Sequence, residues 1–309
     1  MKTPNSVECP QTLQSFVGTI TDVDILEADF GRATLKMSIQ NRHESIDAIF
    51  EPSAQGDPLP NKDWGVVQLM SEPRKSLMGK CVKGYKLTRL RTLDSLDHLP
   101  ASHLERPALV DQAQAWVRTC PIPVLRQFTW QVLGHPNIGI PFFRAQASED
   151  HHHAYLGGLA EHSLAVAKLT LQSLPEMDER EAWLCAIAGL MHDIGKIRCF
   201  DEKGKIAAGF VLRHEQWTLE ILAGALEWMD RQWPDGALAI RCLLTSHATP
   251  ESQRPLLPGA MAITYADRMN SALQVRAKVF SERPQWQRFA RTKGFGPPSR
   301  FWLPSRVSL

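Results

Sequence analysis

The period of the hydrophobic pattern changes once along this chain, and that change limits the folds it can adopt. Within residues 14–93, apolar and polar residues alternate, as in "ATLKMSI" and "SIDAIF" on either side of "QNRHE". A period of two predicts strands joined by hairpins. From residue 108 on, apolar residues recur every three or four positions, as in "GGLAEHSLAVAKLTLQSL", which predicts amphipathic helices. We therefore expect an α+β multidomain protein, with a β domain followed by an all-α domain.

The β segment contains enough short strands to close a small barrel. A barrel of the oligonucleotide-binding (OB) type is the simplest such fold, and any other small β domain is the alternative. The segment "LDSLDHLPASHLERPA" marks a shift in composition between the two patterns. We predict a β-barrel domain at residues 1–95, a linker at 96–110, a helical bundle at 111–283 and a basic, aromatic tail at 284–309.

Composition excludes several classes of protein. With 309 residues the chain can hold two domains and a large core. Its net charge is only +2, so a nucleic acid or a membrane would have to bind to a local patch. The six cysteines form no CxxC pair, which argues against a zinc ribbon and predicts reduced thiols. Neither a signal-peptide core nor a membrane-spanning apolar stretch is evident, so we expect a cytoplasmic protein.

Several titratable residues share a face with apolar residues on separate predicted helices. His162, for example, is in register with Leu159 and Val166, which points its side chain toward the core. A single buried histidine is usually a satisfied core residue, whereas a buried carboxylate must be paired or bound to a cation. We find no Lys or Arg placed to neutralise the two carboxylates, so a divalent metal is the better explanation. The candidate ligands are His162, His192, Asp193, His214, His247 and Asp267.

The pair His192 and Asp193 stands where an apolar helix is predicted to end. Adjacent helix residues point about 100° apart, so the pair suits one site only at a last turn, and Gly195 offers the stop. There His192 can bind one metal, while the two oxygens of Asp193 can bind that metal and a second one. Lys196, one turn later, can contact an anionic substrate; a solvated surface lysine is the alternative.

The segments "GLAEHS", "LMHDIGK" and "YADR" resemble the three motifs of the HD-domain metal-dependent phosphohydrolase superfamily. The resemblance implies an α-helical HD-domain bundle in which the pattern H…HD…D binds a divalent metal. Carried over to this chain, the pattern assigns the metal to His162, His192, Asp193 and Asp267.

A longer similarity runs through "ASEDHHHAYLGGLAEHSLAVAKL", "GFVLRH" and "LLTSHATPE". These segments resemble bacterial 3′→5′ exoribonucleases that join an OB fold to an HD domain. The resemblance implies a second metal held by His214 and His247, and it places His152, His153 and Arg213 where they can contact substrate. His152 and His153 can equally be structural. Ala248 follows His247 where that family has a second histidine, so one ion or two stays open. The relaxase-like HD domains of conjugative-transfer proteins are similar to part of the same sequence.

These features together predict hydrolysis of phosphoesters, with Asp193 and Lys196 as catalytic residues. Mixed His/Asp ligation favours Mn²⁺, with Fe²⁺, Ni²⁺ or Mg²⁺ as alternatives. Single-stranded RNA or DNA is the expected partner, because "KCVKGYKLTRLR" and the tail interleave basic and aromatic residues. The tail can also pack on the bundle through its aromatics. The rival functions are hydrolysis of nucleotides, and a non-enzymatic accessory role in DNA transfer.

Overall fold

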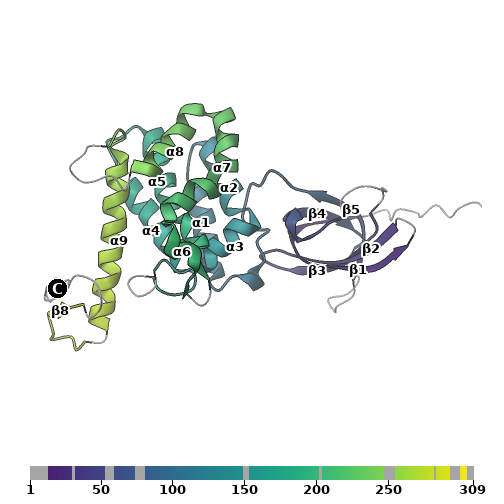
Figure 1. The fold of residues 1–309 in the computed structure, drawn as a ribbon, viewed down its shortest axis with the longest axis horizontal. Helices are drawn as coiled ribbons and strands as arrows, with labels where there is room; N and C mark the ends of the chain where they lie inside the picture. Colours follow the sequence, from purple (N-terminus) through teal and green to yellow (C-terminus); the bar gives the residue numbers. More distant parts are fainter. Residues whose placement is uncertain are drawn as a thin grey trace, which may run out of the picture. The chain divides into compact units, whose positions relative to one another are not determined.

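The structure is a computed structural model, and contacts divide the chain into two compact units. Met1–Ala115 and Thr129–Pro141 form the first unit, and Trp116–Phe128 and Phe142–Leu309 form the second. Each unit is described by itself below (Figure 1). The described residues are 13–29, 32–52, 59–73, 81–148, 153–201, 204–246, 255–281, 283–292 and 300–304.

The first unit confirms the predicted β domain as a five-stranded sheet. Its strands pair in the order β1-β2-β3-β5-β4 and close as a barrel. Along β3 the side chains alternate between exposed and buried, with Ile46, Ala48 and Phe50 inside. Because successive strand residues point to opposite faces, the period of two in the sequence becomes the barrel core. The strands are β1 (Gln14–Asp29), β2 (Arg32–Gln40), β3 (Ser45–Phe50), β4 (Val66–Ser71) and β5 (Val82–Arg89).

The segment predicted as a linker, residues 96–110, is packed within the first unit. Leu96 and Leu99 are fully buried. The Thr19 hydroxyl of β1 donates a hydrogen bond of 2.9 Å to the carbonyl of His98. The segment contains a short 3₁₀ helix, η2 (Ala101–His103), and leads into α1 (Pro107–Arg118). Another 3₁₀ turn, η1 (Lys62–Trp64), precedes β4.

The predicted helices account for most of the second unit. Every residue of α5 from Ala182 to Met191 is buried, as expected of a helix that is apolar on all sides. Helices α4, α8 and α9 pack against α5. The chain's remaining helices include α3, which the sequence pattern did not predict. The bounds are α2 (Pro123–Leu133), α3 (Pro136–Arg144), α4 (Gly158–Gln172), α5 (Glu179–Met191), η3 (Ile194–Arg198), α6 (Ala207–Val211), α7 (His214–Gln232), α8 (Pro234–Ser246) and α9 (Gly259–Ser281).

The tail contains regular structure that the sequence pattern did not indicate. Strands β8 (Phe289–Arg291) and β9 (Arg300–Trp302) pair in an antiparallel hairpin. A second small hairpin joins β6 (Phe200–Asp201) and β7 (Gly204–Lys205). Among the described residues, no helix combines the length and the apolar character needed to cross a membrane.

Candidate metal centre

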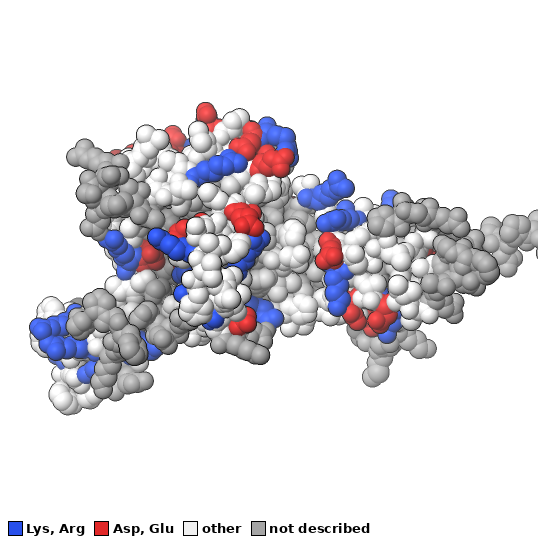
Figure 2. All heavy atoms as spheres, viewed as in Figure 1, with Lys and Arg blue, Asp and Glu red and all other residues white. Residues whose placement is uncertain are grey.

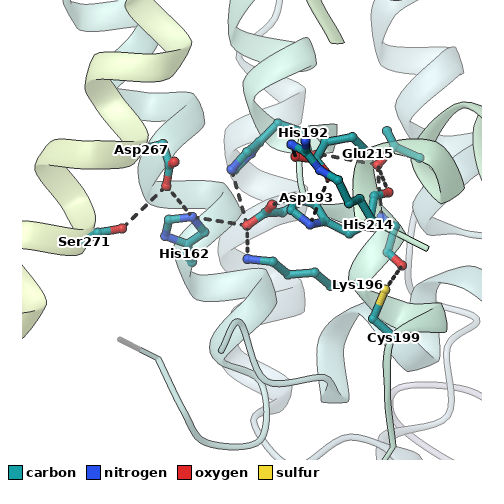
Figure 3. A network of polar contacts seen from close by, with 12 residues as sticks. His162, His192, Asp193, Lys196, Cys199, His214, Glu215, Asp267 and Ser271 are labelled. Carbon is teal, nitrogen blue, oxygen red and sulfur yellow. Dashed lines mark hydrogen bonds and ion pairs between the residues drawn. The ribbon is translucent and has the colours of Figure 1, made fainter. Parts of the chain in front are cut away.

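His192 and Asp193 lie where α5 gives way to a 3₁₀ turn. Helix α5 ends at Met191, His192 is its C-cap, and Asp193 is the N-cap of η3. The predicted helix end is therefore confirmed. The change from α to 3₁₀ geometry redirects the chain between the two residues, and both side chains are buried. Figure 3 shows them pointing toward the same interior space as His162 of α4.

Three side chains converge closely enough to hold one ion. The Nε2 atom of His162 lies 3.5 Å from Oδ2 of Asp193. The Nε2 atom of His192 lies 3.4 Å from the same oxygen. One ligand atom from each of the three residues lies within 4.8 Å of the others. All three residues are buried, and two imidazoles with one carboxylate are a donor set that first-row divalent metals accept.

Asp267 approaches this cluster from α9. Its Oδ1 atom lies 3.1 Å from Nε2 of His162. Burial opposes ionisation of Asp267, but a hydrogen bond from His162 and the charge of His192 outweigh it and lower the pKa of the carboxyl. A second negative charge therefore faces the cluster.

Hydrogen bonds on the far side of each ring determine which nitrogen faces the cluster. Nδ1 of His192 lies 2.7 Å from the carbonyl of Gly189. Nδ1 of His162 lies 2.8 Å from the side-chain oxygen of Asn270. Since both oxygens can only accept, each Nδ1 carries a proton, so Nε2, which faces the carboxylates in the metal-free protein, is the nitrogen that can offer a lone pair when a metal binds. The residues present therefore fit a divalent cation.

Asn270 is a functional residue that sequence reasoning missed. Its Oδ1 atom accepts from His162 and also lies 3.1 Å from Nε2 of His153. The opposite nitrogen of His153 lies 2.8 Å from the Tyr155 hydroxyl, which donates to Glu161 at 2.7 Å. The sequence offered one signal for Asn270, its spacing: it stands three residues after Asp267 and shares the same helix face.

We expect the acceptor on residue 270 to control metal affinity. Asn270→Leu keeps the size of the side chain but removes the acceptor, so His162 loses its orienting hydrogen bond. The Kd for Mn²⁺ should rise about 10–100-fold, the usual effect of losing such a partner. Asn270→Asp keeps an acceptor and should retain affinity near that of the unsubstituted protein. Isothermal titration of the three proteins makes the comparison, and equal affinities would remove Asn270 from the site.

The other oxygen of Asp193 faces a different histidine. Nε2 of His214, at the start of α7, lies 2.9 Å from Oδ1 of Asp193. Nδ1 of His214 lies 3.4 Å from Oε2 of Glu215, which orients the ring. One carboxylate thus lies between a pair of imidazoles and a third one, the arrangement that a bridge between two ions requires. His247 and Ala248 lie outside the described residues.

Lys196 corrects the expectation that no cation stands near the carboxylates. Its Nζ atom lies 2.6 Å from Oδ2 of Asp193. Burial opposes ionisation of Asp193, but the charges of His192 and Lys196 outweigh it and hold the pKa of the carboxyl well below its usual range. Burial likewise opposes charge on His192, but Asp193 raises the pKa of its imidazole overall. The ionised carboxylate of Asp193 thus favours positive charge on the groups around it.

The remaining predicted residues differ in their placement. The side chain of Arg213 is 72% exposed and forms an ion pair of 2.6 Å with Glu215. His153 is buried, with its ring nitrogens directed at Asn270 and Tyr155. That placement favours a positioning role for His153 over direct contact with substrate. His152 lies outside the described residues.

Comparison with known proteins agrees with this geometry. No curated protein and no solved structure matches the chain. The matched family is the HD domain, over residues 159–272. This segment contains His162, His192, Asp193, His214 and Asp267, and its match supports a place in the HD metal-dependent phosphohydrolase superfamily for this part of the chain.

Proposed function

We propose that this chain is a metal-dependent phosphodiesterase that shortens single-stranded nucleic acid from its 3′ end. The observation that carries the proposal is the position of Asp193. One of its oxygens faces His162, His192 and Lys196, and the other faces His214. A buried carboxylate shared in this way suits a hydrolytic site with one or two ions. Mn²⁺ is the ion that we favour for the mixed donor set.

The side chains divide the chemistry between them. When bound, a divalent cation supplies an ionised water near neutral pH and polarises a phosphoryl oxygen. His162, His192, Asp193 and Asp267 would hold that cation. Lys196 presents an ammonium group beside the cluster, where it can neutralise a non-bridging phosphate oxygen. The His214 side chain is 28% exposed, so it lies on the side from which a phosphodiester can enter.

The fold of the first unit supports single-stranded nucleic acid as the substrate. A closed five-stranded barrel with the order β1-β2-β3-β5-β4 agrees with an OB-type fold. Strand β5 exposes Lys83, Lys86 and Arg89, and the ammonium of Lys83 lies 5.8 Å from the ring centre of Tyr85. Basic groups beside a ring are what single-strand binding needs. Lys80, which belongs to the same predicted patch, lies outside the described residues.

An activity screen tests this proposal. Purified protein with Mn²⁺ should convert 5′-labelled single-stranded RNA or DNA into a ladder that shortens from the 3′ end. Mononucleotides and cyclic dinucleotides serve as the competing substrates, and His162→Ala serves as the inactive control. Faster turnover of nucleotides than of strands would instead identify a nucleotide hydrolase. Strand binding without cleavage under any of the four metals would favour the accessory role in DNA transfer.

A further inference from the structure

The β8–β9 hairpin has two faces of different character. In its register Phe289 pairs with Trp302, Ala290 with Phe301, and Arg291 with Arg300. Ala290 is buried and Phe301 is partly buried, so this middle pair faces the protein. The residues of the other two pairs are all exposed. We call the surface formed by Phe289, Arg291, Arg300 and Trp302 the outer face.

The outer face presents a stacked pair of aromatic rings to solvent. The rings of Phe289 and Trp302 have centroids 6.4 Å apart and planes at 28°. Phe289 is 70% exposed and Trp302 is 57% exposed. Trp286, just before β8, is 78% exposed. These three aromatics therefore do not pack into the bundle, whereas Phe301 faces the protein.

Two arginines stand directly opposite each other on the same face. Like charges at paired positions of an antiparallel sheet destabilise it. In the described part of the chain, no acidic side chain forms an ion pair with Arg291 or Arg300, and residues 283–292 and 300–304 contain no Asp or Glu. Figure 2 shows Lys and Arg side chains gathered where Figure 1 labels β8. A bound anion would offset this repulsion.

The hairpin is held in place without using its outer face. The guanidinium of Arg276, on α9, donates to the backbone carbonyl of Trp302 at 3.3 Å. The backbone N–H of Leu303 donates to the carbonyl of Arg288 at 2.9 Å. The side chain of Ala290, in the middle of β8, is buried. The backbone of β9 is thus attached to α9, while the two rings and the two guanidinium groups stay available to a ligand.

We infer that the outer face binds single-stranded nucleic acid, with bases stacked on the two rings and phosphates bound by the two guanidinium groups. The inference rests on the proposed function and extends it, because it names a second contact for the same strand. Stacking rings beside cations are the elements by which single strands are bound without regard to sequence. An anionic membrane would favour an apolar surface uninterrupted by charge, and an acidic peptide would leave the stacked rings without a flat partner.

Binding measurements in EDTA test the inference separately from catalysis. Fluorescence anisotropy follows a short labelled oligothymidylate, which stays intact without metal. Phe289→Ala combined with Trp302→Ala should weaken binding at least about tenfold, since both rings on which bases stack are removed. Arg291→Ala combined with Arg300→Ala should reduce the slope of log K against log salt by about 1.4, for two lost phosphate contacts. Phe210→Ala is the matched control, because Phe210 is also 70% exposed but lies on α6.

The outcomes separate this inference from the proposed hydrolase activity. Unchanged affinity and salt slope in both double variants, with circular dichroism like that of the unsubstituted protein, would overturn the inference even if the protein cleaves strands. Binding of duplex DNA as tightly as of the single strand would also overturn it. So would double variants that lose more affinity for phosphatidylserine vesicles than for the single strand. Weakened strand binding in a protein that lacks hydrolytic activity would support the inference and reject the activity.

Discussion

Asp193→Asn is expected to abolish Mn²⁺ binding and to lower strand hydrolysis at least about a thousandfold, since a bound cation supplies several kcal/mol of transition-state stabilisation. The carboxylate is the only group in contact with His162, His192, Lys196 and His214 together within the described residues. An asparagine offers one neutral oxygen in place of two charged ones. Its amide N–H₂ would also face either Lys196 or an imidazole, where it cannot act as a ligand.

The substitution also has a predictable effect on the metal-free protein. The pKa of Asp193 is depressed because its cationic neighbours outweigh the effect of burial. A depressed carboxyl pKa stabilises the folded state above the ordinary value near 3.8, and this contribution is lost as the pH falls through the folded-state pKa. The acid unfolding of the unsubstituted protein should therefore be steeper than that of Asp193→Asn, which has no such group to protonate.

Thermal unfolding with and without Mn²⁺ measures the loss of metal binding directly. Mn²⁺ should raise the Tm of the unsubstituted protein, because a ligand that binds only the folded state stabilises it. The Tm of Asp193→Asn should not change. Asp235→Asn is the matched control, because Asp235 is an exposed aspartate on α8 of the same unit. A metal-dependent rise in Tm for Asp193→Asn, equal to that of the control, would show that the ion binds elsewhere.

Local patterns were sufficient to predict the elements that carry this site. The burial of His162 followed from its register with Leu159 and Val166, and the end of α5 at His192 followed from the apolar run before it. Both inferences use positions within a few turns of each other. The ion pair between Lys196 and Asp193 was also within reach of the sequence. The two residues are three positions apart, a spacing at which side chains on a helical turn meet.

Contacts between distant segments were beyond such patterns. Asn270 orients His162 across 108 residues of sequence, and no local period connects the two. Helix α3 was missed because its interior contains Gly139 and Pro141, residues that disfavour an isolated helix. Tertiary packing stabilises it, as the full burial of Phe142 and Phe143 indicates. The short strands of the tail offered too few residues for a period of two to be recognised.

Gly195 shows how a residue can be noticed in the sequence for the wrong reason. We predicted it as the C-terminal stop of α5, yet it lies inside η3 and is not among the described glycines with positive φ, which are Gly65, Gly157 and Gly204. Its importance lies in the space beside it. A Cβ atom at this position would lie 1.9 Å from the carbonyl oxygen of His214 and 2.9 Å from Oγ1 of Thr218. Only a glycine lets η3 approach the start of α7 so closely.

Gly195→Ala should therefore damage both stability and activity. The added methyl group meets backbone, which cannot rotate away, so η3 and α7 must separate. The separation would break the hydrogen bond of 3.2 Å from the Gly195 N–H to Thr218 and move His214 from Asp193. We expect a loss of about 1–3 kcal/mol in the free energy of unfolding. Strand hydrolysis should fall about a hundredfold, the usual effect of a displacement near 1 Å in a catalytic site.

Two further variants test why glycine is needed at position 195. They distinguish the close approach of η3 to α7 from a need for a helix-ending backbone conformation. Gly224→Ala lies on α7, where an added Cβ meets nothing within 4 Å, so it should stabilise the protein by about 0.5–1 kcal/mol in urea unfolding. Gly195→Asn tests the alternative, because asparagine adopts left-handed backbone readily and would substitute for a helix stop. The close contact with His214 instead makes Asn at least as damaging as Ala. A stable and active Gly195→Asn protein would mean that backbone conformation, and not the space beside α7, requires glycine at this position.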